Sequence, residues 1–119
     1  MTVPAILVVE DQLLLRMDAM FMIEDAGFLA VGARDTADAL RILEDRTDIR
    51  VIFTDIDMGD GPDGLWLAAC VRDRWPPIHI IVTSGHRRVT ADMMPDGALF
   101  LDKPYTEEQV LTHVRRLAA

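Results

Sequence analysis

The chain has 119 residues, half of them apolar, and a formal net charge of −8 at pH 7. This length suits one domain with its own core, and the apolar fraction excludes a disordered chain. The negative charge argues against direct binding to nucleic acid or an anionic membrane, because both need clustered Lys and Arg. The single cysteine excludes an internal disulfide framework. The chain shows neither a membrane span nor a signal peptide, so we expect a cytoplasmic location.

Short apolar runs alternate with helical patterns along the chain. Runs of β-branched and aromatic residues predict strands, and apolar residues three and four apart predict helices. The predicted strands are 5–9, 29–33, 51–54, 78–83 and 98–101, and the predicted helices are 12–26, 37–46, 65–74, a short one near 87–94, and 107–117. Asp35 or Thr36 can cap the second helix, and Thr106 with Gln109 forms a capping box for the last. The pattern predicts an α/β fold, a doubly wound five-stranded parallel sheet in the order 2-1-3-4-5.

In such a sheet, ligands bind beyond the carboxyl ends of the strands, near the point where the strand order reverses. Reactive side chains follow four of the five predicted strands. They are Glu10 and Asp11 after the first, Asp55 and Asp57 after the third, Thr83 and Ser84 after the fourth, and Lys103 after the fifth. We therefore expect them to share one edge of the sheet.

Three carboxylates at one edge, those of Glu10, Asp11 and Asp55, cannot all stay ionised unless a cation compensates them. Mg²⁺ suits a few carboxylates with several waters and a phosphate oxygen. Lys103 and the Ser84 hydroxyl add a second cation and a hydrogen-bond donor. These are the components of phosphoryl transfer, with Asp55 as the nucleophile that forms an acyl phosphate.

Five short motifs in the right order carry a resemblance to a known family. They are "VVED" at 8–11, "FTDIDM" at 53–58, "DG" at 63–64, "TSG" at 83–85 and "DKPY" at 102–105. With these motifs, the chain resembles a response-regulator receiver domain of two-component signalling (CheY-like) over essentially its whole length. The resemblance implies a flavodoxin-like (βα)5 fold and a regulatory phosphoacceptor rather than an enzyme. Such a domain promotes its own phosphorylation and dephosphorylation.

The resemblance also implies partners and a role for each site residue. Asp55 would accept a phosphoryl group from a sensor histidine kinase or histidine phosphotransferase, then relay it or switch a downstream protein target. The implied roles are Mg²⁺ binding by Glu10, Asp11, Asp55 and the Asp57 backbone carbonyl, phosphoryl contacts by Ser84 and Lys103, a switch formed by Ser84 and Phe100, and tuning of the acyl-phosphate lifetime by Asp57 and His86. The Lys103–Pro104 peptide bond is expected to be cis, as in the family. Asp11 could also cap the first helix.

The loop after Asp55 departs from the family pattern. Gly59 stands where the family usually has proline, and the distance to Asp63 and Gly64 is one residue longer than in the common form. We expect a reshaped loop in which Asp60 and Asp63 form turns. The switch hydroxyl is ambiguous between Thr83 and Ser84, and the alignment of strand four favours Ser84.

The first predicted helix has two apolar stripes. The first contains Leu15, Ala19, Met22, Ile23 and Ala26, and the second contains Leu14, Met17 and Phe21. The second stripe either docks the helical bundle of a kinase, as in the family, or is partly buried in the fold.

The residues around Asp55 leave other functions to consider. Asp55-Ile56-Asp57 superficially resembles the nucleophile motif of haloacid-dehalogenase-type phosphatases, but it follows the third strand rather than the first. A receiver-like binding module without phosphoryl chemistry is the other alternative. A calcium-binding EF-hand loop fails, because Trp66 stands where the bidentate glutamate should be. Met1 and the end of the chain after the last helix suggest a stand-alone receiver.

Overall fold

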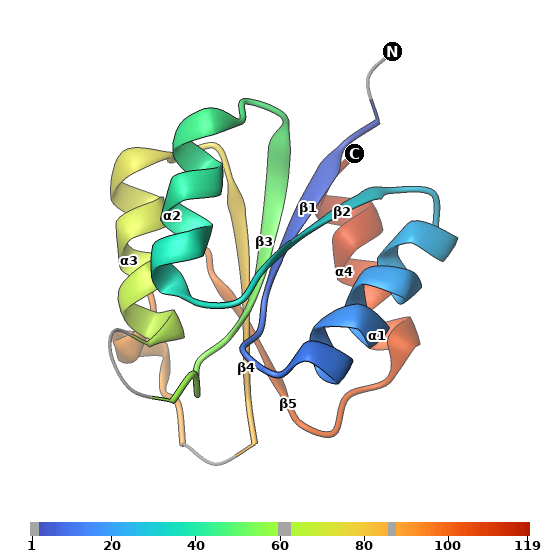
Figure 1. The fold of residues 1–119 in the computed structure, drawn as a ribbon. Coiled ribbons are helices and arrows are strands. Elements are labelled where there is room, and N and C mark those ends of the chain that lie inside the picture. The colour runs from blue at the N-terminus through green and yellow to red at the C-terminus, as the bar shows by residue number, and fades with distance from the viewer. Residues whose placement is uncertain (1–2, 60–62, 86–87) are drawn as a thin grey trace.

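The computed structural model describes residues 3–59, 63–85 and 88–119. Within these ranges, five parallel strands form one sheet in the order β2-β1-β3-β4-β5, and the predicted α/β topology is confirmed (Figure 1). The strands are β1 (Ala5–Val9), β2 (Leu29–Ala33), β3 (Ile49–Asp55), β4 (His79–Ser84) and β5 (Leu99–Asp102). The helices are α1 (Leu13–Asp25), α2 (Thr36–Asp45), α3 (Gly64–Arg74) and α4 (Glu107–Leu117).

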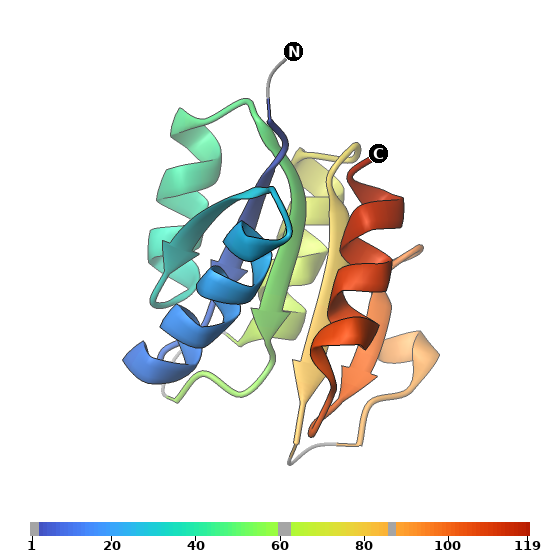
Figure 2. The ribbon, with the colours of Figure 1, turned by 90° about the vertical axis from the view of Figure 1, so that its right-hand side faces the viewer.

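Helices cover both faces of the sheet. Figures 1 and 2 show α1 and α4 on one face, and α2 and α3 on the other. Successive residues of a strand point to opposite faces, so Ile6 and Val8 of β1 pack in the cluster beside α1 and α4. Leu7 and Val9 belong to the cluster beside α2 and α3. Both faces of β1 are buried, as a central parallel strand requires. No helix in the described ranges is long and apolar enough to cross a membrane.

The helix starts follow the predicted capping chemistry in two cases. Asp35 accepts a hydrogen bond from the backbone N–H of Asp38, and Thr106 and Gln109 form the capping box of α4. Asp63 does more than form a turn, because its side chain accepts from the backbone N–H of Leu65 at 3.0 Å. It is the N-cap of α3. Asp60 lies outside the described residues.

The predicted short helix near 87–94 is wrong for the part that is described. Residues 88–90 are not helical, and only a single 3-10 turn, η1 (Ala91–Met93), follows them. Pro95 disfavours helical backbone at Met94. No residue of η1 is buried, although Val89 and Met94 on either side of it are partly buried against the cluster beside α2 and α3.

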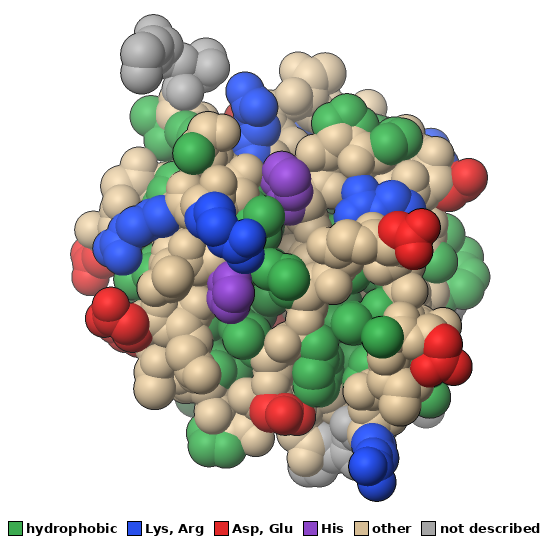
Figure 3. Space-filling model, turned by 180° about the vertical axis from the view of Figure 1, so that it is seen from behind, with side chains coloured by type: hydrophobic (Ala, Val, Ile, Leu, Met, Phe, Trp, Pro, Cys, Tyr) green, Lys and Arg blue, Asp and Glu red, His purple; other side chains and the backbone are tan. Residues whose placement is uncertain are grey.

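Because only η1 forms in the described part of this segment, β5 is incompletely covered. Leu99, Phe100 and Leu101 are each only half-buried, and Met93 is 49% exposed. Figure 3 views the molecule from behind and shows apolar side chains in the middle of this face. The outer strand β5 therefore leaves apolar side chains partly exposed to solvent.

Candidate phosphoacceptor site

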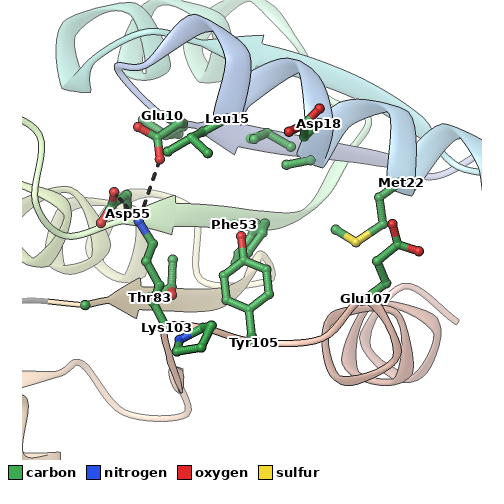
Figure 4. A pocket seen from close by; sticks show the side chains of 15 residues that line it. Glu10, Leu15, Asp18, Met22, Phe53, Asp55, Thr83, Lys103, Tyr105 and Glu107 are labelled. Atoms are coloured by element: carbon green, nitrogen blue, oxygen red, sulfur yellow. Dashed lines mark hydrogen bonds and ion pairs between the residues drawn. The ribbon is translucent and has the colours of Figure 1, made fainter.

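The predicted site residues meet at the carboxyl edge of the sheet. Glu10 follows β1, Asp55 ends β3, Ser84 ends β4 and Lys103 follows β5. Because all five strands run in the same direction, their carboxyl ends bring these four side chains to one edge. Figure 4 shows Glu10, Asp55 and Lys103 at this edge. The sheet topology alone accounts for this gathering.

Asp55 lies at the centre of the site and is only 7% exposed. Lys103 Nζ donates to Asp55 Oδ2 at 2.8 Å, and the backbone N–H of Asp57 donates to Asp55 Oδ1 at 3.0 Å. Burial opposes the charged form of Lys103, but the hydrogen bond and charge of Asp55 outweigh it and raise the Lys103 pKa. Asp55 is thus a buried carboxylate with one oxygen on a lysine and the other on a backbone amide.

Glu10 is a second buried carboxylate at the same edge, also 7% exposed. Its Oε1 lies 3.9 Å from Lys103 Nζ (Figure 4), and its Oε2 accepts from the backbone N–H of Gln12 at 3.0 Å. Burial raises the Glu10 pKa to about 7, and the nearby Asp11 side chain and the charge of Asp55 add to the rise. The single charge of Lys103 does not compensate this cluster of acids.

Asp11 differs from the other two carboxylates, because it is exposed. Its Oδ2 lies 3.6 Å from the place where a Cβ on Gly59 would stand, so it faces the loop that follows β3. Asp11 does not cap α1. The N-cap is Gln12, which makes no capping hydrogen bond with its side chain.

The carboxylates of Glu10 and Asp55 at this edge suit the usual binding of Mg²⁺ by one or two carboxylates and several waters. Within the described ranges, no three His, Cys, Asp or Glu side chains are grouped closely enough to form a metal cage. Mg²⁺ does not need such a cage, since one or two carboxylates and several waters are its usual ligands. Burial is the main cause of the raised Glu10 pKa and the charge of Asp55 adds to it, so a divalent cation bound here would favour the ionised form of Glu10.

The two candidate hydroxyls point in different directions. Ser84 Oγ donates to Asp57 Oδ2 at 2.7 Å. Thr83 pairs with Asp55 in the sheet register and lines a cavity beside it, and its buried Oγ1 has no hydrogen-bond partner among the described residues. The contact between Ser84 and Asp57 was not predicted from the sequence.

Phe100 lies on the same face of the sheet as Ser84. The register pairs Val82 with Phe100 and Ser84 with Asp102, and side chains two apart in a strand share a face. Phe100 packs, half-buried, against the cluster beside α2 and α3. His86, the second predicted tuning residue, lies outside the described residues.

The Lys103–Pro104 peptide bond is cis, as expected. Gly85 lies beside this lysine, because a Cβ at that position would stand 3.3 Å from Lys103 Cβ. The "TSG" and "DKPY" motifs are therefore in contact through the lysine stem.

A cavity of about 570 Å³ opens beside Asp55, between α1 and the segment after β5 (Figure 4). Its walls are mainly apolar and include Met22 of α1 and Phe53 of β3. Tyr105 packs edge-on against Phe53, with ring centroids 5.6 Å apart, and burial raises the pKa of its phenol. In the sequence Tyr105 stands out only as part of the "DKPY" motif, and no sequence pattern indicates the cavity.

The second apolar stripe of α1 is exposed. Leu14 is 75% exposed, Phe21 59% and Met17 40%. Of the first stripe, Ala19, Met22 and Ile23 are buried, whereas Leu15 is 44% exposed and lines the cavity. The second stripe, Leu14, Met17 and Phe21, is therefore not needed to hold α1 against the sheet.

The fold and the carboxyl-edge site define a class, the aspartate-bearing receiver domains. A family model described as the response regulator receiver domain matches residues 6–115. The chain belongs to this family. It is a receiver domain of a two-component response regulator, and this family consists of regulatory phosphoacceptors rather than conventional enzymes.

Solved structures and curated relatives agree with this assignment. A response regulator receiver protein from Sinorhizobium medicae is 31% identical, with a TM-score of 0.90 over 98% of this chain and 94% of that one. A receiver protein from Pseudomonas putida is 27% identical, with a TM-score of 0.86 over 98% of both chains. A protein named as an NtrX-like response regulator from Rickettsia bellii is 25% identical over 93% of this chain. The present chain spans 24% of that relative's length.

Proposed function

We propose that this chain accepts a phosphoryl group on Asp55 from a phosphohistidine of a sensor histidine kinase or histidine phosphotransferase. It then relays the group or switches a downstream protein partner, in the cytoplasm. The observation that carries the proposal is the setting of Asp55, a buried carboxylate 2.8 Å from the Lys103 ammonium and next to Glu10. Receiver domains in general interact with histidine kinases and effectors. On this basis we propose that this chain, too, has a kinase and a target protein.

The reaction is a displacement at phosphorus. One Asp55 oxygen forms a bond to phosphorus while the bond from phosphorus to the histidine nitrogen breaks, and the imidazole leaves with the electron pair. Lys103 offsets the negative charge that gathers on the acceptor and phosphoryl oxygens. Ser84 contributes a hydroxyl donor to a phosphoryl oxygen once the group is in place.

Glu10, Asp11, Asp55 and the backbone carbonyl of Asp57 are proposed to hold Mg²⁺. Receiver domains generally bind this ion at their acidic pocket, and Glu10 and Asp55 supply the buried carboxylates here. Bound there, the ion supplies positive charge to the phosphoryl oxygens. We also propose that the domain promotes its own dephosphorylation, with Asp57 and His86 tuning the lifetime of the acyl phosphate.

The exposed stripe of Leu14, Met17 and Phe21 is the proposed docking surface for the phosphodonor. It lies on α1, the helix that also lines the cavity beside Asp55. A helical bundle seated there would bring its phosphohistidine to the carboxyl edge of the sheet. Exposed apolar side chains in a contiguous stripe are typical of protein-binding surfaces.

The test is intact-mass measurement after incubation with acetyl phosphate and MgCl₂. We expect one phosphoryl group per chain, a gain of about 80 Da, that requires Mg²⁺ and is absent in Asp55→Asn. Asp102→Asn is a matched control, since Asp102 is an exposed aspartate that ends β5 at the same edge. This control should gain the same mass as the parent.

Two outcomes would contradict the proposal. An unchanged mass gain in Asp55→Asn would place the phosphoryl group elsewhere. No gain in the parent with acetyl phosphate or with a phosphorylated histidine phosphotransferase, together with no Mg²⁺ binding by calorimetry, would leave a binding module without phosphoryl chemistry.

A further inference from the structure

Asp57 contacts both Asp55 and Ser84, the acceptor and the hydroxyl proposed to contact the phosphoryl group. Its backbone N–H donates to Asp55 Oδ1 at 3.0 Å. Its side-chain Oδ2 accepts from Ser84 Oγ at 2.7 Å. Asp57 therefore contacts both the Asp55 carboxylate and the Ser84 hydroxyl, and the proposed function requires this hydroxyl to contact the phosphoryl group on Asp55.

A serine hydroxyl has one proton and donates one strong hydrogen bond at a time. In the unphosphorylated chain that proton is directed to the Asp57 carboxylate, and hydrogen bonds to ionised acceptors are roughly twice as strong as neutral ones. A phosphoryl group on Asp55 would present a second ionised acceptor for the same proton. The two acceptors compete for Ser84.

We propose that Asp57 is a positioning residue that holds the Ser84 hydroxyl in the unphosphorylated state, so that breaking this hydrogen bond opposes the switch. This inference rests on the proposed function, because it takes Ser84 as the hydroxyl that contacts the phosphoryl group. It gives the Asp57 side chain a role in the resting state, separate from any effect on hydrolysis of the acyl phosphate.

Burial makes the competition matter. Ser84 is 1% exposed and Asp57 is half-buried, so water is a poor substitute acceptor for the hydroxyl. The Asp57 charge also disfavours a phosphoryl group by simple repulsion. Loss of the carboxylate would favour the phosphorylated state for both reasons, and only the hydrogen-bond effect depends on Ser84.

A double-mutant cycle separates the two effects. The probe is beryllofluoride with MgCl₂, a non-covalent mimic of the phosphoryl group, and its affinity is measured by calorimetry. The four proteins are the parent, Asp57→Ala, Ser84→Ala and the double variant. We expect Asp57→Ala to tighten binding about fivefold to tenfold more when residue 84 is serine than when it is alanine.

Asp57→Asn is the conservative variant and guards against misfolding. Its amide oxygen still accepts from Ser84, without the charge. We expect its serine-dependent gain in affinity to be smaller than that of Asp57→Ala. In the absence of beryllofluoride, the same cycle measured by urea unfolding should show that Asp57 and Ser84 stabilise each other.

Equal gains from Asp57→Ala in both backgrounds would reduce the effect to charge repulsion and overturn the inference. Absence of coupling in the unfolding cycle would also overturn it. Both results leave the proposed function standing if the parent binds beryllofluoride and gains a phosphoryl group. If the parent neither binds beryllofluoride nor gains a phosphoryl group, the proposed function is wrong, and so is the inference that rests on it.

Discussion

Gly64 packs directly against the backbone of Asp55. A Cβ at position 64 would stand 2.3 Å from the Asp55 carbonyl oxygen and 2.8 Å from Ile56 Cα. The backbone N–H of Gly64 also donates to the carbonyl of Ile56 at 3.1 Å. The start of α3 therefore packs against the backbone of the acceptor Asp55 and of its neighbour Ile56, and only glycine allows this approach.

Gly64→Ala should displace the acceptor strand end and destabilise the fold. Overpacking of this kind costs about 1–3 kcal/mol, measurable by urea unfolding, and phosphorylation by acetyl phosphate should slow in parallel. Gly32→Ala is the matched control, because the nearest atom to its added Cβ is Sδ of Met20, the end of a flexible side chain. A loss in Gly64→Ala no larger than in Gly32→Ala would contradict the close packing.

Lys103→Ala should nearly abolish phosphorylation without unfolding the chain. The ammonium offsets the charge on Asp55 and on the incoming phosphoryl oxygens, and loss of one such group typically costs about 10²–10³-fold in rate. The rate is followed by intact mass with acetyl phosphate. Lys103→Arg should rescue poorly, since its planar, branched guanidinium differs in shape from an ammonium.

Arg34→Ala is the control for the lysine prediction. Arg34 follows β2 at the same edge of the sheet, but its side chain is 78% exposed. Its removal should leave the rate within about twofold of the parent, because exposed charges are screened by water. A similar loss in both variants would mean that only the net charge matters.

The stability of the metal-free protein should depend on pH through Glu10. Its pKa is raised by burial to about 7 in the folded chain, against 4.5 for the unperturbed group. Between pH 4.5 and about 7 the folded state keeps a proton on Glu10 that the unfolded state has already released. This proton therefore stabilises the folded state fully below pH 4.5, and the stabilisation is lost as the pH rises to about 7. The Asp11 side chain and the charge of Asp55 also raise the Glu10 pKa, and the charge of Lys103 lowers it.

Urea unfolding in EDTA at pH 5, 6, 7 and 8 checks the sign. The stability of the parent relative to Glu10→Gln should fall by about 2 kcal/mol across this range and level off above pH 7. MgCl₂ should stabilise the parent more at pH 8 than at pH 5, because a metal ligand must be deprotonated. A difference that is constant from pH 5 to 8 would show that Glu10 ionises normally.

Charges introduced on the apolar stripe of α1 should affect only the protein donor. Met17→Glu with Phe21→Lys should slow transfer from a phosphorylated histidine phosphotransferase by about tenfold or more, since contacts at the centre of an interface dominate its energy. Phosphorylation by acetyl phosphate should be unchanged. Leu29→Lys, at an exposed apolar residue on β2, is the matched control and should affect neither reaction. Equal loss with both donors would argue against docking at this stripe.

The sequence allowed the sheet order and the positions of the reactive residues to be predicted together. Parallel strands place the residues at their carboxyl ends at one edge of the sheet. Predicting the positions of Glu10, Asp55, Ser84 and Lys103 therefore required strand ends correct only to within one residue, which is how the predicted ends of β3, β4 and β5 differ from the observed ones. The bounds of α4 were predicted without error, because a capping box marks its start and its apolar residues are strongly periodic.

Features that depend on tertiary contacts were missed. The predicted helix near 87–94 had a plausible local pattern, but in the described part of this segment only η1 forms, ahead of Pro95. The hydrogen bond from Ser84 to Asp57 links residues 27 apart and has no sequence signal. The "DG" pair at 63–64 was quoted as a motif, but the capping by Asp63 and the close approach of Gly64 to Asp55 appear only in the fold.

Arg72 of α3 fastens the amino ends of the last two strands. Its guanidinium donates to the backbone carbonyls of Pro76 and Ile78 before β4, and to that of Asp96 before β5. These carbonyls lie at the edge of the sheet opposite Asp55. The two strands are thus pinned at one end by a single side chain, while their other ends carry Ser84 and Lys103. The amino ends of the two strands are therefore held together by contacts that are separate from the site residues at their carboxyl ends.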